Sequence, residues 1–467
     1  MVNLCGACPS VIHFPPPRPT CRSLIRCLPA EGAACGQFWS RGFGQLTAVG
    51  ESQLRTLGGL LRQRYTVLLQ GGLPPTYARE QVYIRSTNYD RTLQSAMSLL
   101  QGMFAPGTGL AFPNGSFALQ GGVAVPPVHT VQLASDLLLR AFNGDTCSVW
   151  PNMVQAEQAA FATEFQQHIA ASDGMTAALG AAVGLPNLTY AELGGVADSL
   201  LCMRAHGRTW PAGVTQAMYT AAHAEAQWAL FNTYRQLPQR QASGGTALGM
   251  LAARLTAAAT PGGVQPQFDP SSFPAPSGLQ ARGPTLAVYS AHDTTLLTLL
   301  YALLGPAQVL ANPPYASTVI VELVGMDGGG DIGTATPAVR LWYNRGIGTG
   351  DSGGHSAPFD TANLLQLPGC ANVGTGGDVL CSLPDWLAGT AAIAQADVSA
   401  LCAVGGEQDK LGRGGLSPGA ATAAGAGGML ALLLLALGAR WLCRRREVEG
   451  GARGPYGTLH TPPPHHD

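Results

Sequence analysis

Short apolar runs alternate along this chain with stretches of helical period, and this alternation most constrains the fold. Four runs have the length and apolar content of buried strands: QVYI at 81–84, LAVYS at 286–290, STVIVELVG at 317–325 and AVRLWYN at 338–344. Apolar residues recur at helical spacing at 51–69, 93–104 and 294–305. Strands that alternate with helices predict an α/β protein, a sheet with flanking helices.

Composition divides the rest of the body into segments. Residues 134–256 are largely rich in Ala, Leu and Gln with few β-branched runs, which favours a helical cap inserted into the fold. Residues 257–283 are rich in Ala, Pro, Gly and Ser without an apolar period, which predicts a flexible inserted loop. We therefore assign the α/β core to residues 37–133 and 284–403, on either side of the cap and the loop.

The C-terminal part contains one long stretch without charged residues, residues 416–439, which ends in MLALLLLALGA. Because about 20 apolar residues cross a bilayer, we predict a single transmembrane helix at 418–439, preceded by a stalk at 404–417. Arginines at 440 and 444–446 follow at once. By the positive-inside rule they place the tail, 440–467, in the cytosol, so that the body faces the lumen or the exterior. The alternative, a buried C-terminal helix, gives the arginine cluster no role.

Two sequons and eleven cysteines favour this secretory topology. Asn114-Gly-Ser and Asn187-Leu-Thr are acceptors for N-glycosylation. Widely spaced cysteines in a long chain suit a few disulfides, the alternative being buried thiols. The atypical N-terminal segment 1–36 disagrees, because it has no continuous apolar region and therefore no signal peptide. A net charge of -1, with 11% charged residues, argues against a nucleic-acid partner.

The first polar motif follows the strand predicted at 81–84, in VYIRSTNYDRT. Arg85 stands at the carboxyl end of this strand, where ligands bind in open α/β sheets. A guanidinium group at that place can bind a phosphate in bidentate fashion. The alternative is a surface ion pair between Arg85 and Asp90, which the motif taken alone favours.

The second polar motif is VYSAHDTTLL, in which a strand ends in His292-Asp293 and a helix begins. A helix N-terminus favours an anion, so His292 could bind a phosphoryl oxygen and Asp293 could protonate a leaving alcohol. The alternatives are a core histidine and an aspartate that only caps the helix. Two polar strand ends that meet over one sheet edge favour the catalytic interpretation.

Together the two motifs resemble the downstream signatures of the histidine acid phosphatases, the lysosomal, prostatic and testicular group. GFGQLTAVGESQLRTLGGLLRQRY is similar to the segment that links that family's first strand to its first long helix. VPPVHTVQLASDLLLR, PPYASTVIVEL and LQLPGC follow in the family's order, so the resemblance covers residues 37–403. It implies hydrolysis of small phosphate monoesters or phosphoproteins at acid pH through a phosphohistidine. Arg85 and His292 would bind phosphate, Asp293 would be the general acid, and neither metal nor cofactor is implied.

The family's nucleophile signature, R-H-G-x-R-x-P, is not found in this sequence. His13 in VIHFPPPRPT and His206 in AHGRTW have the wrong neighbours. Without the signature no residue remains to be phosphorylated. We also expect the first strand of the sheet to be missing, which would expose strand edges in the middle of the sheet.

Three hypotheses account for the missing signature, and we favour the first. In the first, the sequence is incomplete and lacks the signal peptide and the nucleophile together. In the second, the chain is a catalytically inactive single-pass membrane glycoprotein of the family. In the third, the His-Asp pair belongs to a metal-dependent phosphohydrolase, but no further cluster of ligands supports that interpretation.

The resemblance also implies which cysteines pair. It implies two disulfides, Cys147–Cys402 and Cys370–Cys381. Cys202 should pair with a cysteine of the family's PPYAS segment, but Thr318 stands at that position. We therefore expect Cys202 to form no disulfide.

The tail carries a candidate sorting signal. In PYGTL, Tyr456 and Leu459 form a Y-x-x-Φ pattern, which looks like the endocytic signal of lysosomal acid phosphatase and would bind a sorting adaptor. The resemblance therefore implies a single-pass type I protein of the lysosomal or endosomal membrane with a lumenal catalytic domain. It further implies a homodimer.

Overall fold

The computed structural model of the protein describes residues 2–6, 27–69, 72–260, 263, 284–306, 312–326, 336–346, 359–374 and 377–403. The predicted stalk (404–417), transmembrane helix (418–439) and tail (440–467) lie outside the described residues, as does most of the predicted loop 257–283. Within the described residues, no helix is both long enough and apolar enough to cross a bilayer.

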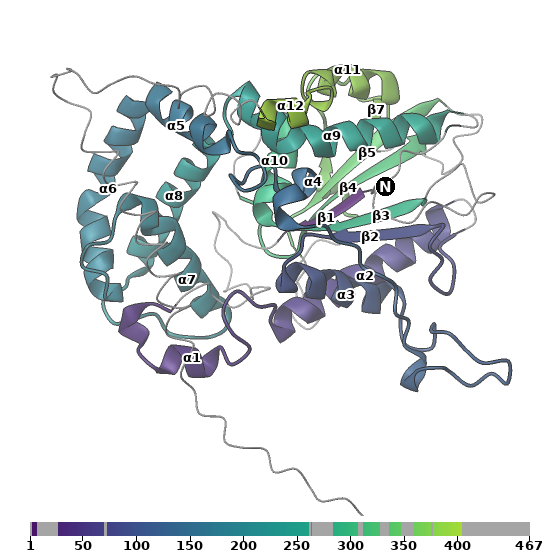
Figure 1. Cartoon of the computed structure of the whole chain (residues 1–467), viewed down its shortest axis with the longest axis horizontal. Coiled ribbons are helices and arrows are strands. Elements are labelled where there is room, and N and C mark those ends of the chain that lie inside the picture. The colour runs from purple at the N-terminus through teal and green to yellow at the C-terminus, as the bar shows by residue number, and fades with distance from the viewer. Residues whose placement is uncertain are drawn as a thin grey trace, which may run out of the picture. The chain divides into compact units, whose positions relative to one another are not determined.

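A seven-stranded sheet forms the centre of the described body (Figure 1). Its order is β2-β3-β1-β4-β5-β6, and β7 pairs with β5. The strands are β1 Val2–Gly6, β2 Val82–Ser86, β3 Leu286–Ser290, β4 Ser317–Gly325, β5 Pro337–Asn344, β6 Leu364–Leu365 and β7 Leu380–Ser382. The four predicted strands are β2 to β5, so the α/β prediction is confirmed. Strands β2, β3 and β1 are parallel to their neighbours in this group, whereas β4 and β5 are antiparallel.

Strand β1 shows that the expectation of a missing first strand was wrong. It lies between β3 and β4, where Val2 pairs with Ala287 in parallel and with Val321 in antiparallel register. The sequence does not reveal β1, because VNLCG is too short to show a period and its partners lie far along the chain. The centre of the sheet therefore has no exposed edge, and the carboxyl end of β1 lies at the same sheet edge as that of β3.

Alternate residues of the strands point to two helical layers. Leu286 and Val288 of β3 belong to one apolar cluster, with α2 (Ala48–Leu68) and α3 (Asp90–Met103). Ala287 and Tyr289 belong to the other, with α9 (Leu237–Ala259), α10 (Asp293–Leu304) and α11 (Leu383–Ala394). The buried strands are apolar on both faces because helices cover both sides of the sheet (Figure 1).

Helices α2 and α3 contact each other through their backbones. A Cβ atom built on Gly58 of α2 would lie 1.9 Å from the carbonyl oxygen of Leu99. A Cβ atom on Gly102 of α3 would lie 1.9 Å from the carbonyl oxygen of Arg55. Only residues without a side chain allow this approach, so the two glycines set the distance between the helices.

A buried carboxylate ties α2 to the sheet. Glu322 of β4 is 4% exposed and accepts hydrogen bonds from Arg64 Nε and Nη2, the Tyr65 hydroxyl, Arg340 Nε and Trp342 Nε1, at 2.6 to 3.0 Å. Burial alone would raise the pKa of Glu322, but the hydrogen bond and charge of Arg64, the charge of Arg340 and the Tyr65 hydroxyl lower it to about 2. The side chain is therefore held as an anion.

The cap consists of four consecutive helices, α5 (Trp150–Ala160), α6 (Ala162–Val183), α7 (Leu193–Ala205) and α8 (Gln216–Asn232). Helix α8 packs against both α6 and α7. Helix α9, which its composition had assigned to the cap and to the first residues of the loop, packs instead against α10 and α11 of the core. The shorter helices are α1 Ala34–Phe38, α4 Leu137–Arg140 and α12 Val398–Ala403, with 3-10 turns at Pro29–Glu31, Gln120–Gly122, Leu133–Ser135, Tyr190–Glu192 and Thr361–Asn363.

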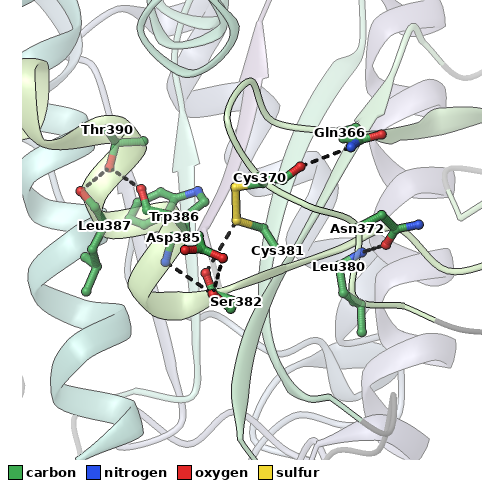
Figure 2. The surroundings of a disulfide bond; sticks show 10 residues. All are labelled: Gln366, Cys370, Asn372, Leu380, Cys381, Ser382, Asp385, Trp386, Leu387 and Thr390. Carbon is green, nitrogen blue, oxygen red and sulfur yellow. Dashed lines mark hydrogen bonds between the residues drawn. A yellow bond between two sulfur atoms is a disulfide. The ribbon is translucent and has the colours of Figure 1, made fainter.

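Three disulfides cross-link the described residues. The two pairs that the resemblance implies, Cys147–Cys402 and Cys370–Cys381, are both formed. Figure 2 shows the second of these beside the start of α11, where the Cys370 carbonyl accepts a hydrogen bond from Gln366 at 3.1 Å. The third pair, Cys27–Cys35, was not predicted.

Cys202 takes part in none of the three disulfides. Its sulfur is buried on α7 and lies 3.3 Å from the hydroxyl of Tyr315. Tyr315 precedes β4, so this contact joins the cap to the core.

Candidate active site

The junction between β3 and α10 carries the predicted His-Asp pair. Strand β3 is buried along its whole length, and α10 begins at Asp293. His292 occupies the N-cap position, where its backbone N–H donates to the Thr295 hydroxyl at 3.3 Å. The residue that caps the helix is therefore His292, one position before Asp293, which the alternative interpretation had named as the cap. Both side chains lie at the carboxyl edge of the sheet.

The His292 imidazole lies between the two motifs. It is 8% exposed, with Nε2 3.2 Å from the Thr87 hydroxyl and Nδ1 3.4 Å from Nη2 of Arg91. The rings of His292 and Tyr89 are also nearly perpendicular, with centroids 5.0 Å apart.

Arg91 is a residue of the first motif that the sequence alone did not single out. It lies in the first turn of α3, with its guanidinium carbon 4.7 Å from the centre of the Tyr89 ring. It lines the same pocket as His292 and Asp293. Its place six residues after Arg85, at the start of the next helix, was the available clue.

Arg85 lies at the carboxyl end of β2, as predicted, but it does not line this pocket. Its guanidinium forms a buried ion pair with Asp136, so the surface pair with Asp90 is not formed. Burial raises the pKa of Asp136, against the lowering effect of the Arg85 charge. Among the described residues, Nε of Arg85 and Oδ2 of Asp136 have no hydrogen-bond partner. One buried N–H of Arg85 therefore lacks a hydrogen-bond partner among the described residues, at a cost in free energy.

Asp293 is held by donors from two directions. Oδ1 accepts from the backbone N–H of Thr294 at 2.8 Å, and Oδ2 accepts from Nδ2 of Asn312 at 3.2 Å. Asn312 stands before Pro313 and Pro314, in the segment that leads into β4. The sequence contains no motif that would have singled it out.

A pocket of about 440 Å³ joins these groups to the cap. Its volume lies in the range of small-molecule sites. The core supplies Tyr89, Arg91, Arg140, Phe142, Asn143, His292, Asp293, Thr294 and Asn312, and the cap supplies Gly194, Gly195, Asp198, His223, Ala226, Gln227 and Leu230. One wall thus carries cations and the His-Asp pair, and the other carries neutral and acidic groups.

His223 gives the cap wall its polar character. Burial and the charge of Arg204, against the opposing charge of Asp198, lower the pKa of His223 to about 4. Its Nε2 accepts a hydrogen bond from Nε2 of Gln227 at 2.8 Å. The imidazole is therefore neutral at mildly acidic pH and adds no positive charge to the pocket.

The predicted glycosylation sites lie at the surface, where Asn114 and Asn187 are both exposed and their amides are accessible. Tyr456 and Leu459 lie outside the described residues, as does His13. Within the part of the chain that the structure describes, no group of three or more His, Cys, Asp and Glu side chains could hold a metal ion.

The described residues thus form an α/β core with a group of helices beside it, and a pocket at the carboxyl edge of the sheet lined by arginine, histidine and aspartate. Residues 33–344 match the histidine phosphatase superfamily, branch 2. The chain belongs to this family.

Curated relatives are acid phosphatases. Lysosomal acid phosphatase of Homo sapiens is 31% identical over 353 residues, which cover 75% of this chain and 70% of the relative. Testicular acid phosphatase of Homo sapiens is 35% identical over 347 residues, which cover 71% and 68%. The phytase of Klebsiella sp. ASR1 has the same fold, with a TM-score of 0.54 at 18% identity over 84% of this chain and 94% of the phytase.

Proposed function

We propose that the pocket binds phosphate monoesters and that its chemistry is that of an acid phosphatase. The observation that carries the proposal is the contact between Arg91 and His292 beside Asp293, at the carboxyl edge of the sheet. Cationic and imidazole donors suit phosphoryl oxygens, and the neighbouring carboxyl suits proton delivery to a leaving alcohol. The acid phosphatase relatives support the same substrate class.

Each side chain has a separate role in this proposal. Arg91 and His292 bind the phosphoryl oxygens, whereas Arg85 stays in its buried ion pair with Asp136 outside the pocket. Asp293 protonates the alcohol oxygen as the P–O bond breaks. A phosphohistidine route also needs an imidazole nucleophile in line with that bond, which the family's R-H-G-x-R-x-P signature would supply.

Phosphate binding tests the first step without turnover. We expect the full chain to bind inorganic phosphate at about pH 5, as measured by isothermal titration calorimetry, and Arg91→Ala to weaken binding at least about tenfold. Arg79→Ala is the matched control, because Arg79 is exposed and pairs only with its neighbour Glu80 among the described residues. Equal loss in both variants, or no binding by the parent chain, would overturn the proposal.

Turnover can be tested by supplying the missing signature. Gly6 ends β1, so Gly6→Arg, Ala7→His, Cys8→Gly, Ser10→Arg and Ile12→Pro together write R-H-G-x-R-x-P after this strand. With a chromogenic phosphate monoester at about pH 5, we expect the parent chain to be slow and the grafted chain to be faster by about 10² or more. If the chain binds phosphate but the grafted signature does not increase the rate of hydrolysis, the result favours a catalytically inactive member of the family.

The second candidate is a catalytically inactive membrane glycoprotein of the same family. The absence of R-H-G-x-R-x-P from the sequence favours it. It predicts phosphate binding without hydrolysis, in the parent chain and in the grafted chain alike. Sequencing the 5′ end of the transcript tests whether the protein in cells begins with MVNLCGACPS.

We further propose a type I topology in the lysosomal or endosomal membrane, as a homodimer. Three disulfides and two exposed sequons suit an oxidising lumen, and several relatives are lysosomal acid phosphatases. A C-terminal epitope tag should be digested by protease added to intact microsomes, while the body remains protected. Protection of the tag would overturn this topology. Light scattering on the purified protein tests the dimer.

A further inference from the structure

A chain of hydrogen bonds connects Asp293 to the cap through Asn312. Nδ2 of Asn312 donates to Oδ2 of Asp293 at 3.2 Å, and its backbone N–H donates to Oε1 of Gln227 at 3.3 Å. Gln227 then donates to Nε2 of His223 at 2.8 Å. All four residues line one pocket, so the connection runs along its wall from α10 of the core to α8 of the cap.

We propose that Asn312 is a positioning residue, which holds the carboxyl group of Asp293 against the pocket and is itself anchored to the cap by Gln227. The inference rests on the proposed function for the role of Asp293 as proton donor. It adds a residue of the segment before β4 to the site, and it makes α8 part of the support of the catalytic carboxyl.

The local geometry suits this role. Asn312 is 5% exposed, so packing limits the motion of its side chain, and Pro313 restricts the backbone from which that side chain reaches Asp293. The second oxygen of Asp293 is fixed by the backbone N–H of Thr294. A carboxyl held at both oxygens points in one direction, which favours proton transfer to one place in the pocket.

The Asn312 amide also affects the acidity of the Asp293 carboxyl group. An N–H donor stabilises the carboxylate more than the carboxylic acid, because the bond strengthens when the acceptor carries charge. Asn312 therefore stabilises the form that Asp293 takes after it has given up its proton. The effect is local, since an amide has no net charge of its own.

Other titratable and charged groups near Asp293 contribute a constant background. Tyr234, which follows α8, interacts with the charge of Asp293. Burial and the Asp293 carboxylate both raise the pKa of the Tyr234 phenol. The remaining groups that line the pocket are Tyr89, Arg91, Arg140 and His292 of the core and Asp198 and His223 of the cap. Replacement of Asn312 changes none of these residues, so a change in the titration of Asp293 reports on the amide.

The test is the titration of Asp293 in the full chain, followed by the ¹³C shift of its labelled carboxyl carbon. The signal is assigned by its loss in Asp293→Asn. We expect Asn312→Leu, which keeps the volume and removes the donor, to raise the pKa of Asp293 by roughly one pH unit. Asn143→Leu is the matched control, because Asn143 lines the same pocket and its amide donates to the Arg140 carbonyl at 3.4 Å.

The outcomes distinguish a positioning role of Asn312 from a general effect of substitution in the pocket. An unchanged pKa in Asn312→Leu, or equal changes in Asn312→Leu and Asn143→Leu, overturns the inference. Gln227→Leu, which keeps the Asn312 amide and removes its anchor, should raise the pKa in the same direction by a smaller amount. If Asn312→Leu does not fold, an unchanged pKa in Gln227→Leu overturns the inference and a raised one supports it.

The titration needs no turnover. If the parent chain binds no phosphate but Asn312→Leu raises the pKa of Asp293 as expected, the proposed function is overturned. The positioning role of Asn312 then still stands. Phosphate binding with an unchanged pKa would overturn the positioning role alone.

Discussion

Replacement of Glu322 by Gln should destabilise the protein at neutral pH and much less at low pH. The side chain is 4% exposed and accepts five hydrogen bonds, four of which come from Arg64, Arg340 and Trp342. A glutamine at this position would keep the shape, but it would remove the counter-charge shared by Arg64 and Arg340, of which only Arg340 keeps another carboxylate partner, Asp378, among the described residues. Breaking a buried ion pair in this way costs about 3 to 5 kcal/mol.

The pH dependence follows from the pKa of Glu322. Its value of about 2 in the folded protein lies below the usual 4.5, so the unfolded chain binds the proton more tightly. The resulting stabilisation, about 3 kcal/mol, is fully present above about pH 4.5 and is lost as the pH falls toward about 2. At about pH 5 nearly all of it remains.

Urea unfolding followed by tryptophan fluorescence, at several pH values between about 3 and 7, measures this contribution. The free energies of unfolding of the parent and of Glu322→Gln should approach each other as the pH falls. Glu51→Gln is the control, because Glu51 pairs with Arg41 at an exposed position and should contribute less than about 1 kcal/mol. A loss below about 1 kcal/mol at neutral pH, or a difference independent of pH, would refute the reasoning.

Three further predictions concern packing, cross-linking and the surface. Gly102→Ala should lower the free energy of unfolding by more than about 2 kcal/mol in urea titrations, since its methyl group would overlap a carbonyl of α2. Gly174→Ala, with open space around it on α6, should be neutral or stabilising by up to about 1 kcal/mol. Cys147→Ser should cost about 2 to 5 kcal/mol and lower the calorimetric melting temperature; an unchanged temperature would contradict the role of this bond. Asn114→Gln and Asn187→Gln should each remove one glycan from protein made in mammalian cells, seen as a step in gel mobility that endoglycosidase abolishes.

The fold was largely predictable where a segment carries its own pattern. Strand β3 and helix α10 were found at nearly their final bounds, because LAVYS is apolar throughout and Gly305 ends the helix. Strand β1 was missed because its stability comes from pairing with β3 and β4, which leaves no trace in its own five residues. Helix α9 was assigned to the wrong layer because its composition resembles that of the cap, and only its contacts place it in the core.

The site was predictable only where a residue sits at a strand end. His292 and Asp293, which line the pocket, stand out in the sequence because a polar pair after a buried strand is conspicuous. Arg91 and Asn312 were missed because each enters the pocket from a separate element, and no spacing along the chain relates them to Asp293. Arg85 lies at the predicted strand end but does not line the pocket, because its guanidinium pairs with Asp136, a contact between residues distant in the sequence.

The backbone contact between α2 and α3 has a consequence for the interpretation of sequence variants. Gly102 and Arg91 stand at opposite ends of α3, about 16 Å apart along its axis. A helix transmits a displacement along its length, because its backbone hydrogen bonds hold it rigid. A methyl group added at position 58 or 102 would therefore displace the guanidinium of Arg91 without touching the pocket. When variants of this protein are classified, substitutions of Gly58 and Gly102 should therefore be expected to affect the pocket as substitutions of its lining residues do.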